Sequence, residues 1–139
     1  MFNTMFTYMN IRSNIRRIGF EFLKLKLQNK QNMVIIHTLK NDEQLCLIHD
    51  TLRAEFEETK INECLMDYLF DTEIVVYGKH SADESAEQKC KQFIQLGFKN
   101  VNWYVGGLFE WLLLQELYGK EEFPTTGICR DLLMYRATS

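Results

Sequence analysis

Long apolar runs, internal repeats and prolines are missing or rare in this 139-residue sequence, which contains a single proline. A chain without a long apolar run cannot cross a bilayer as a helix, and a chain without a repeat is not a solenoid. Since 46% of the residues are hydrophobic, disorder and low complexity are excluded as well. The composition therefore favours one compact domain that buries a core of its own.

The cysteines lack the spacing of a metal site or of a disulfide framework. The four are widely scattered, with no Cys-x-x-Cys pair and no histidine at ligand spacing: Cys46, Cys64, Cys90 and Cys129. The three histidines are isolated from one another. We therefore expect free, mostly buried thiols in a reducing compartment, and neither a metal ion nor a cofactor.

Positive charge is scarce outside the first quarter of the chain. Residues 1–32 carry six Lys and Arg against one acidic residue, whereas residues 33–139 carry ten against eighteen. Nucleic-acid binding requires clustered cations, which the acidic body does not offer. We therefore expect neither a nucleic acid nor a membrane as a partner.

The basic N-terminal segment has two interpretations. It contains Arg, Ser and Thr and no acid before Glu21, which is the composition of a mitochondrial transit segment, and it lacks the apolar centre of a secretory signal. A short extension that is poorly ordered is the simpler interpretation. We expect such an extension over residues 1–16, a domain over residues 17–139 and a cytoplasmic location, with the mitochondrion as the alternative.

Strand-like and helix-like patterns alternate along the domain. Apolar, β-rich runs cover residues 33–39, 46–52, 72–78 and 100–107, and helical spacing covers residues 21–30, 57–70, 84–97 and 108–119. Strands separated by helices of about ten to fifteen residues predict βαβ units. The sequence thus predicts an α/β fold with a mainly parallel central sheet flanked by helices. We expect Trp111 and Leu112, in the last apolar helix, to pack against this sheet.

An ordered series of residues from Ile74 to Trp111 resembles the second half of a rhodanese-like domain. "IVVYG" leads into a loop and a helix, "LGFKNV" leads into the next strand, and "GG" followed by Trp opens the next helix. "FPTTG", residues 123–127, is similar to a C-terminal trait of the family, and residues 22–39 resemble its first helix and strand. The resemblance extends over most of residues 17–139 and implies a single rhodanese-like domain.

The resemblance also draws attention to the loop after Tyr77. Rhodaneses carry sulfur as a persulfide on a cysteine directly after the central strand, where backbone N–H groups and a helix dipole stabilise the thiolate. This chain has Gly78 at that position, and a glycine offers no nucleophile. The loop has the length found in cell-cycle phosphatases of the same fold, but Glu84 stands where their arginine is expected.

The loop is the candidate site, and we expect it to be degenerate, with no catalytic residue. Its members are Gly78, Lys79, His80, Ser81, Ala82, Asp83, Glu84 and Ser85. A Ser-His-Asp mechanism needs side chains oriented from separate elements, which neighbours in one loop do not provide. Asp83 or Ser81 is expected to cap the following helix. Lys79 and His80 are expected to face solvent, with a small anion held on the loop amides as the alternative.

Three functions are compatible with these residues. The preferred one is a catalytically inactive rhodanese-like module that binds a protein partner or regulates it, and its diagnostic residues are Gly78 and Glu84. The alternative is an active sulfurtransferase or thiol enzyme that uses a displaced cysteine, Cys46. The third is a structural subunit, which requires an exposed apolar patch between Leu112 and Leu117. The fold does not decide among them.

Overall fold

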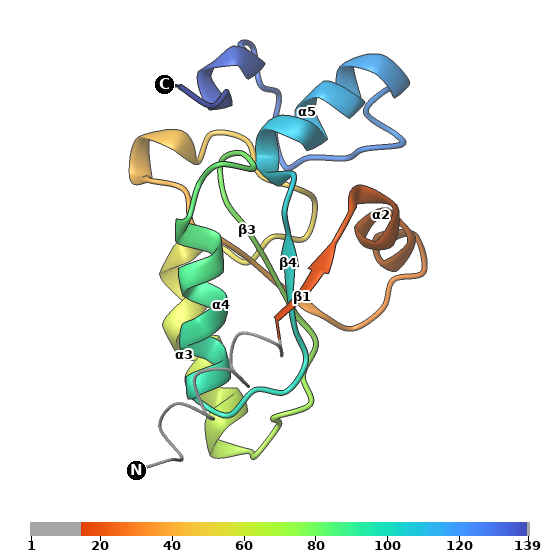
Figure 1. Cartoon of the computed structure of the whole chain (residues 1–139). Helices are drawn as coiled ribbons and strands as arrows, with labels where there is room; N and C mark the ends of the chain where they lie inside the picture. Colours follow the sequence, from red (N-terminus) through yellow and green to blue (C-terminus); the bar gives the residue numbers. More distant parts are fainter. Residues whose placement is uncertain (1–14, 139) are drawn as a thin grey trace.

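The computed structural model describes residues 15–138, which form a parallel β-sheet with helices on both faces (Figure 1). The strands are β1 (Ile15–Ile18), β2 (Val34–His37), β3 (Ile74–Tyr77) and β4 (Val101–Tyr104). The helices are α2 (Phe20–Gln28), α3 (Ala54–Met66), α4 (Ser85–Gln95) and α5 (Gly107–Tyr118), with two short 3-10 helices, η1 (Asn41–Glu43) and η2 (Leu132–Tyr135). The predicted α/β fold is confirmed.

The sheet has four strands in the order β1-β4-β3-β2, and every neighbouring pair is parallel. In register, Ile74 of β3 pairs with Val34 on one side and Val101 on the other. All residues of β3 and β4 are buried, which explains why β3 reads as a continuous apolar run; β4 also buries the polar Asn102. Because the strands are parallel, their carboxyl ends meet along one edge of the sheet.

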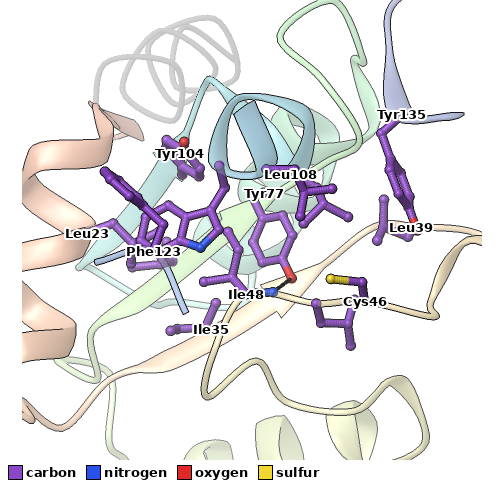
Figure 2. Packing of buried hydrophobic residues seen from close by; sticks show 14 of the residues in the cluster. Leu23, Ile35, Leu39, Cys46, Ile48, Tyr77, Tyr104, Leu108, Phe123 and Tyr135 are labelled. Carbon is purple, nitrogen blue, oxygen red and sulfur yellow. Dashed lines mark hydrogen bonds between the residues drawn. The ribbon is translucent and has the colours of Figure 1, made fainter. Parts of the chain in front are cut away.

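Side chains of successive strand residues point into two separate hydrophobic cores. The core between the sheet and helices α2 and α5 includes Leu23, Ile35, Val75, Tyr77, Tyr104, Leu108 and Trp111 (Figure 2). The core between the sheet and helices α3 and α4 includes Ile36, Ile61, Cys64, Val76, Cys90, Phe93 and Trp103. Because successive side chains point to opposite faces, each strand contributes residues to the cores on both faces of the sheet.

Trp111 anchors the first core, as predicted. Its side chain is fully buried and that of Leu112 nearly so. The indole Nε1 donates a hydrogen bond to the carbonyl oxygen of Pro124 at 3.1 Å, and the Phe123 ring packs edge-on against the indole at 5.0 Å between centroids. The segment after α5 is thus held along the helix by both apolar and polar contacts.

One strand prediction was wrong. Residues 46–52 form no strand but two isolated bridges, an antiparallel one between Ile48 and Thr125 and a parallel one between Thr51 and Ile35. The two ends of this apolar run pair with different segments, so no continuous ladder develops.

Strand β1 has no counterpart among the predicted elements. It pairs with β4 at the edge of the sheet, and its Arg16 and Arg17 side chains are exposed. It starts at Ile15, before the domain boundary expected at residue 17. Residues 1–14, most of the expected extension, lie outside the described residues.

Neither a membrane-spanning helix nor a metal cluster occurs within residues 15–138. No helix of this part of the chain has the length and apolar character needed to cross a bilayer. Nor does this part bring three or more His, Cys, Asp or Glu side chains together in a way that would hold a metal ion.

Candidate functional site

The loop that the sequence singled out joins the carboxyl end of β3 to the first turn of α4, and it lies at the edge of the sheet beside the start of α5 (Figure 1). Tyr77, the residue before it, is fully buried. The Tyr77 hydroxyl accepts a hydrogen bond from the backbone nitrogen of Ile48 at 3.1 Å (Figure 2) and lies 2.8 Å from the hydroxyl of Thr51. The end of β3 is therefore fixed where the loop begins.

The N-terminus of α5 holds the loop backbone. The carbonyl oxygen of Gly78 accepts a hydrogen bond from the backbone nitrogen of Leu108 at 3.0 Å, and that of Lys79 accepts one from Phe109 at 2.9 Å. Gly107 permits this approach, since it has a φ of 71° and a Cβ there would lie 2.9 Å from the Gly78 oxygen. The glycine pair at the start of α5, Gly106 and Gly107, thus brings the helix directly onto the loop.

The Asp83 carboxylate folds back into the loop. Its Oδ2 accepts a hydrogen bond from the backbone nitrogen of Lys79 at 3.2 Å. Its Oδ1 accepts one from the backbone nitrogen of Ser85 at 3.0 Å and one from the Ser85 hydroxyl at 2.7 Å. Thr38 Oγ1 lies 2.6 Å from Ser85 Oγ, and because the Ser85 hydrogen points to Asp83, Thr38 is the donor to Ser85.

These contacts keep the Asp83 side chain ionised at neutral pH. Burial by itself would raise the pKa of Asp83, but the hydrogen bonds from Ser85 and Lys79, together with the nearby His80, outweigh it and hold the pKa below its ordinary value of 3.8. The prediction that Asp83 or Ser81 caps α4 was wrong in position, because Asp83 stands one residue before the N-cap, although its carboxylate does bind the first backbone nitrogen of the helix. Glu84 occupies the N-cap position itself, without a capping hydrogen bond from its side chain.

The Lys79 side chain is paired with η1. Its Nζ lies 2.6 Å from Glu43 Oε2, and the other oxygen of Glu43 accepts a hydrogen bond from the backbone nitrogen of Lys40 at 2.9 Å. Burial acts to raise the pKa of Glu43, but Lys79 and Lys40 outweigh it and keep the pKa below its ordinary value of 4.5. The Lys79 ammonium group, which was expected to face solvent or else to hold a small anion, thus faces a carboxylate.

The remaining polar residues of the loop are His80, Ser81 and Glu84. His80 Nδ1 accepts a hydrogen bond from the backbone nitrogen of Ala82 at 3.2 Å. Ser81 and Glu84 are exposed. Within residues 15–138 no hydrogen bond joins the side chains of His80, Ser81 and Asp83 into a Ser-His-Asp arrangement, in line with the expectation from the sequence.

Position 78 is crowded. A Cβ on the buried Gly78 would lie 3.0 Å from Asp83 Oδ2 and 3.2 Å from Thr38 Oγ1. Gly78 is not one of the glycines with a positive φ, so space, and not backbone conformation, favours glycine there. The acidic group next to this position is therefore Asp83, whereas the sequence drew equal attention to Glu84.

Three of the four thiols are buried, and the fourth, Cys129, is partly buried. Cys46 is fully buried in the first core, and its Sγ donates to the carbonyl oxygen of Gly127 at 3.5 Å (Figure 2). Burial raises the pKa of Cys90 to about 12 and also raises the pKa of the half-buried Cys129. Reactive thiols require a stabilised thiolate and access to solvent, which these surroundings do not favour.

Two residues of the site, Thr38 and Glu43, were missed from the sequence. Thr38 follows β2 as Gly78 follows β3, and its backbone nitrogen donates to the carbonyl oxygen of Tyr77 at 3.1 Å. Because β2 and β3 are parallel and in register, that correspondence was a usable signal for Thr38. The position of Glu43 depends on the path of η1, for which the sequence carries no comparable signal.

Comparisons with known proteins agree with this architecture. The sequence matches the family described as the Rhodanese-like domain over residues 21–114. No curated protein matches it significantly.

Three solved structures illustrate the likeness in fold. Saccharomyces cerevisiae Ygr203w, described as a homolog of single-domain rhodanese and Cdc25 phosphatase catalytic domain, has a TM-score of 0.62 and 13% identity, covering 91% of this chain and 95% of that one. BH2092 from Bacillus halodurans has a TM-score of 0.60 and 19% identity, with 90% and 85% covered. Alr3790 from Anabaena sp. has a TM-score of 0.58 and 21% identity, with 84% of each chain covered. At such identities the likeness concerns the fold alone.

Proposed function

Because the chain belongs to the rhodanese-like domain family, we propose that it is a catalytically inactive member that acts as a binding or regulatory module for a protein partner. The observation that carries this proposal is Gly78, which by the resemblance stands where rhodaneses place their sulfur-carrying cysteine. The space that a side chain would need there borders on the Asp83 carboxylate and the Thr38 hydroxyl. Sulfur transfer through a persulfide has no carrier at this position.

The electrostatics of the loop support the same proposal. A persulfide or a phosphoenzyme requires N–H donors and cations that are free to stabilise an anion. Here the backbone nitrogens of Lys79 and Ser85 bind Asp83, and the Lys79 ammonium binds Glu43. These three groups, which could serve an anionic substrate, are occupied within the chain.

A protein partner is supported by apolar side chains on α5. Leu113, Leu117 and Tyr118 are all exposed, although Leu112 is buried. Leu113 and Leu117 are four residues apart and so lie on one side of the helix. Exposed apolar groups gathered in this way are typical of a protein interaction surface, which a binding module and a structural subunit both require.

The test is a thiosulfate:cyanide sulfur-transfer assay on the purified chain, with an active rhodanese as the positive control and a parallel assay with an aryl phosphate. We expect no turnover above the uncatalysed rate in either assay. Turnover that disappears in Cys46→Ser but persists in Cys129→Ser would overturn the proposal in favour of a thiol enzyme that uses a displaced cysteine. Turnover unaffected by both substitutions would also overturn it.

A further inference from the structure

We infer that the open edge of strand β1 is a docking site for an extended acidic peptide segment, which pairs with β1 as a further strand and places two adjacent carboxylates beside Arg16 and Arg17. The inference deepens the proposed function and rests on it, because it names the chemistry of the protein partner of a binding module. It involves neither the loop after β3 nor the apolar side chains of α5.

Strand β1 lies at the end of the sheet, and one side of its backbone has no partner strand within residues 15–138 (Figure 1). On the paired side, the carbonyl oxygen of Ile18 accepts a hydrogen bond from the backbone nitrogen of Val105 at 3.4 Å. Backbone groups alternate in direction along a strand, so the N–H and C=O groups of Arg17 point to the opposite, open side. Such an edge is a template for main-chain pairing with another extended segment.

The two arginine side chains of β1 lie on opposite faces of the sheet. Arg16 Cζ is 4.5 Å from the centre of the Phe22 ring, and Arg17 Cζ is 5.1 Å from the centre of the Trp103 ring. Phe22 packs against the core beside α2 and α5, whereas Trp103 belongs to the core beside α3 and α4. Cation–π contacts therefore hold one positive charge on each face of the β1 edge.

The charge of this edge makes carboxylates its complement. Arg16 and Arg17 are exposed and form no ion pair within residues 15–138, whereas Lys24 and Lys26 of the adjacent helix α2 each bind a carboxylate. Two copies of the chain paired through this edge would bring arginines together, and like charges on neighbouring strands repel. A nucleic acid would supply negative charge but lacks the peptide groups that main-chain pairing needs. An acidic peptide meets both requirements.

The positions of the arginines also specify the sequence pattern of the partner. Successive side chains of a strand point to opposite faces, and residues paired across two strands point to the same face. A partner strand therefore reaches both Arg16 and Arg17 with two consecutive acidic residues. Acids separated by one residue would both lie on one face. The expected pattern is a pair of adjacent Glu or Asp residues flanked by residues that favour a strand.

The experiment titrates the whole native chain with capped six-residue peptides and follows the backbone amides by NMR. The test peptide is TVEEVT, and its matched control is TEVEVT, which has the same composition and charge but places both glutamates on one face. TVEEVT should shift the Arg17 amide signal saturably, with a Kd lower than that of TEVEVT by roughly two- to fivefold, the contribution of one exposed ion pair. TVEEVT with both glutamates N-methylated keeps its charges but loses main-chain donors, so it should give no saturable shift.

Substitutions in the chain identify the surface. Arg16→Gln and Arg17→Gln should each weaken TVEEVT binding by roughly two- to fivefold and abolish its preference over TEVEVT. Arg53→Gln is the matched control, because Arg53 is exposed at the start of α3, a helix that packs beside β2 at the other edge of the sheet. It should leave the Kd of TVEEVT unchanged.

Three results would each overturn the inference: no saturable shift with TVEEVT, equal Kd values for TVEEVT and TEVEVT, or unchanged binding of the N-methylated peptide. The proposed function fails on a different measurement. Turnover in the sulfur-transfer assay, together with selective binding of TVEEVT, would reject catalytic inactivity and leave the docking site standing. Absence of both turnover and peptide binding would reject the docking site and leave the inactive member standing.

Discussion

Lys79 Nζ and Glu43 Oε2 lie 2.6 Å apart, and this ion pair connects the loop after β3 to the 3-10 helix η1. The side chains are only 28% and 13% exposed, respectively. Glu43 is held in turn by the backbone nitrogen of Lys40. Because this pair is shielded from water, solvent screening weakens its electrostatic attraction less than in an ordinary surface pair. Because the backbone fixes its acceptor, forming the pair also costs less side-chain entropy.

Breaking this pair should destabilise the chain measurably. Lys79→Met and Glu43→Gln are each expected to lower the free energy of unfolding by about 1 to 3 kcal/mol, because the remaining partner stays partly buried. In a double-mutant cycle by urea unfolding, the coupling energy should be about 1 kcal/mol or more. The control pair is Lys91 and Glu87, one turn apart on α4 at 3.6 Å, for which about 0.3 to 0.5 kcal/mol is expected. Equal coupling energies for the two pairs would contradict the prediction.

Trp111→Ala should be among the most destabilising substitutions in the chain. The indole is fully buried and donates one of the two hydrogen bonds that the Pro124 carbonyl oxygen accepts, so its removal leaves a cavity and loses that hydrogen bond. We expect a loss of about 3 to 5 kcal/mol in the free energy of unfolding. Leu117→Ala serves as the control on the same helix, since Leu117 is 74% exposed and should change stability by less than about 0.5 kcal/mol. An unchanged melting temperature of Trp111→Ala would be inconsistent with this packing.

The parts of the fold that could be predicted from sequence are those where one physical signal dominates. Strand β3 is buried on both faces, and an uninterrupted apolar run is the pattern that such burial requires. Strand β1 has the opposite character, because two of its four residues are exposed arginines and only its ladder with β4 makes it a strand. Residues 46–52 have strand-like composition, but Ile48 and Thr51 bridge to different segments. Backbone pairing with distant segments determines that β1 is a strand and that residues 46–52 are not, and such pairing cannot be read from composition.

The candidate site, too, could be predicted from the sequence only in part. The place of the loop follows from the order of strands and helices, whereas the capping prediction, Asp83 or Ser81, missed the N-cap, which is Glu84. That the second carboxylate oxygen of Asp83 reaches back to Lys79 depends on the loop's path, which no local pattern specifies. Asp83 and Glu84 are adjacent acids of equal charge in the sequence. Only the direction of each side chain distinguishes the one that fills the loop from the one that faces solvent.

His37 should make stability depend on pH below its ordinary pKa. Its side chain is buried, its Nδ1 accepts a hydrogen bond from the backbone nitrogen of Leu39 at 3.0 Å, and its Nε2 has no partner among the described residues. Burial lowers the pKa of His37 below 6.5, with Lys89 acting in the same direction and Glu57 against it. The folded state therefore binds fewer protons than the unfolded state once the pH falls below about 6.5.

The stability contributed by neutral His37 is complete above the unfolded-state pKa and is lost as the pH falls through about 6.5 toward the folded-state pKa. Urea unfolding at a series of pH values should show this decline. His37→Asn keeps an acceptor for Leu39 but does not titrate, so it should flatten this part of the profile. His49→Asn, at an exposed histidine, should leave the decline as it is in the native chain. A profile of His37→Asn with the native slope would show that another group is responsible.

Restoring a thiol at position 78 should require the removal of Asp83 as well. In a Cys129→Ser background, which removes the partly exposed native thiol, Gly78→Cys is expected to react slowly with iodoacetamide at neutral pH. The new side chain would begin 3.0 Å from Asp83 Oδ2, and a neighbouring carboxylate raises the pKa of a thiol. Adding Asp83→Ala should release the loop N–H donors to the thiolate and lower that pKa.

The pH dependence of the alkylation rate measures the pKa of the thiol directly, and each unit by which it falls increases the thiolate fraction at neutral pH about tenfold. Glu84→Arg is the informative comparison, because it changes the local charge by two units at an exposed position and leaves the Asp83 carboxylate beside position 78. Its effect on Gly78→Cys should be smaller than that of Asp83→Ala and should shrink as salt is added, since exposed charges are screened. If Glu84→Arg instead matched Asp83→Ala at every salt concentration, long-range charge and not occupation of the loop would control the thiol. The contact between Asp83 and position 78 would then have no chemical consequence.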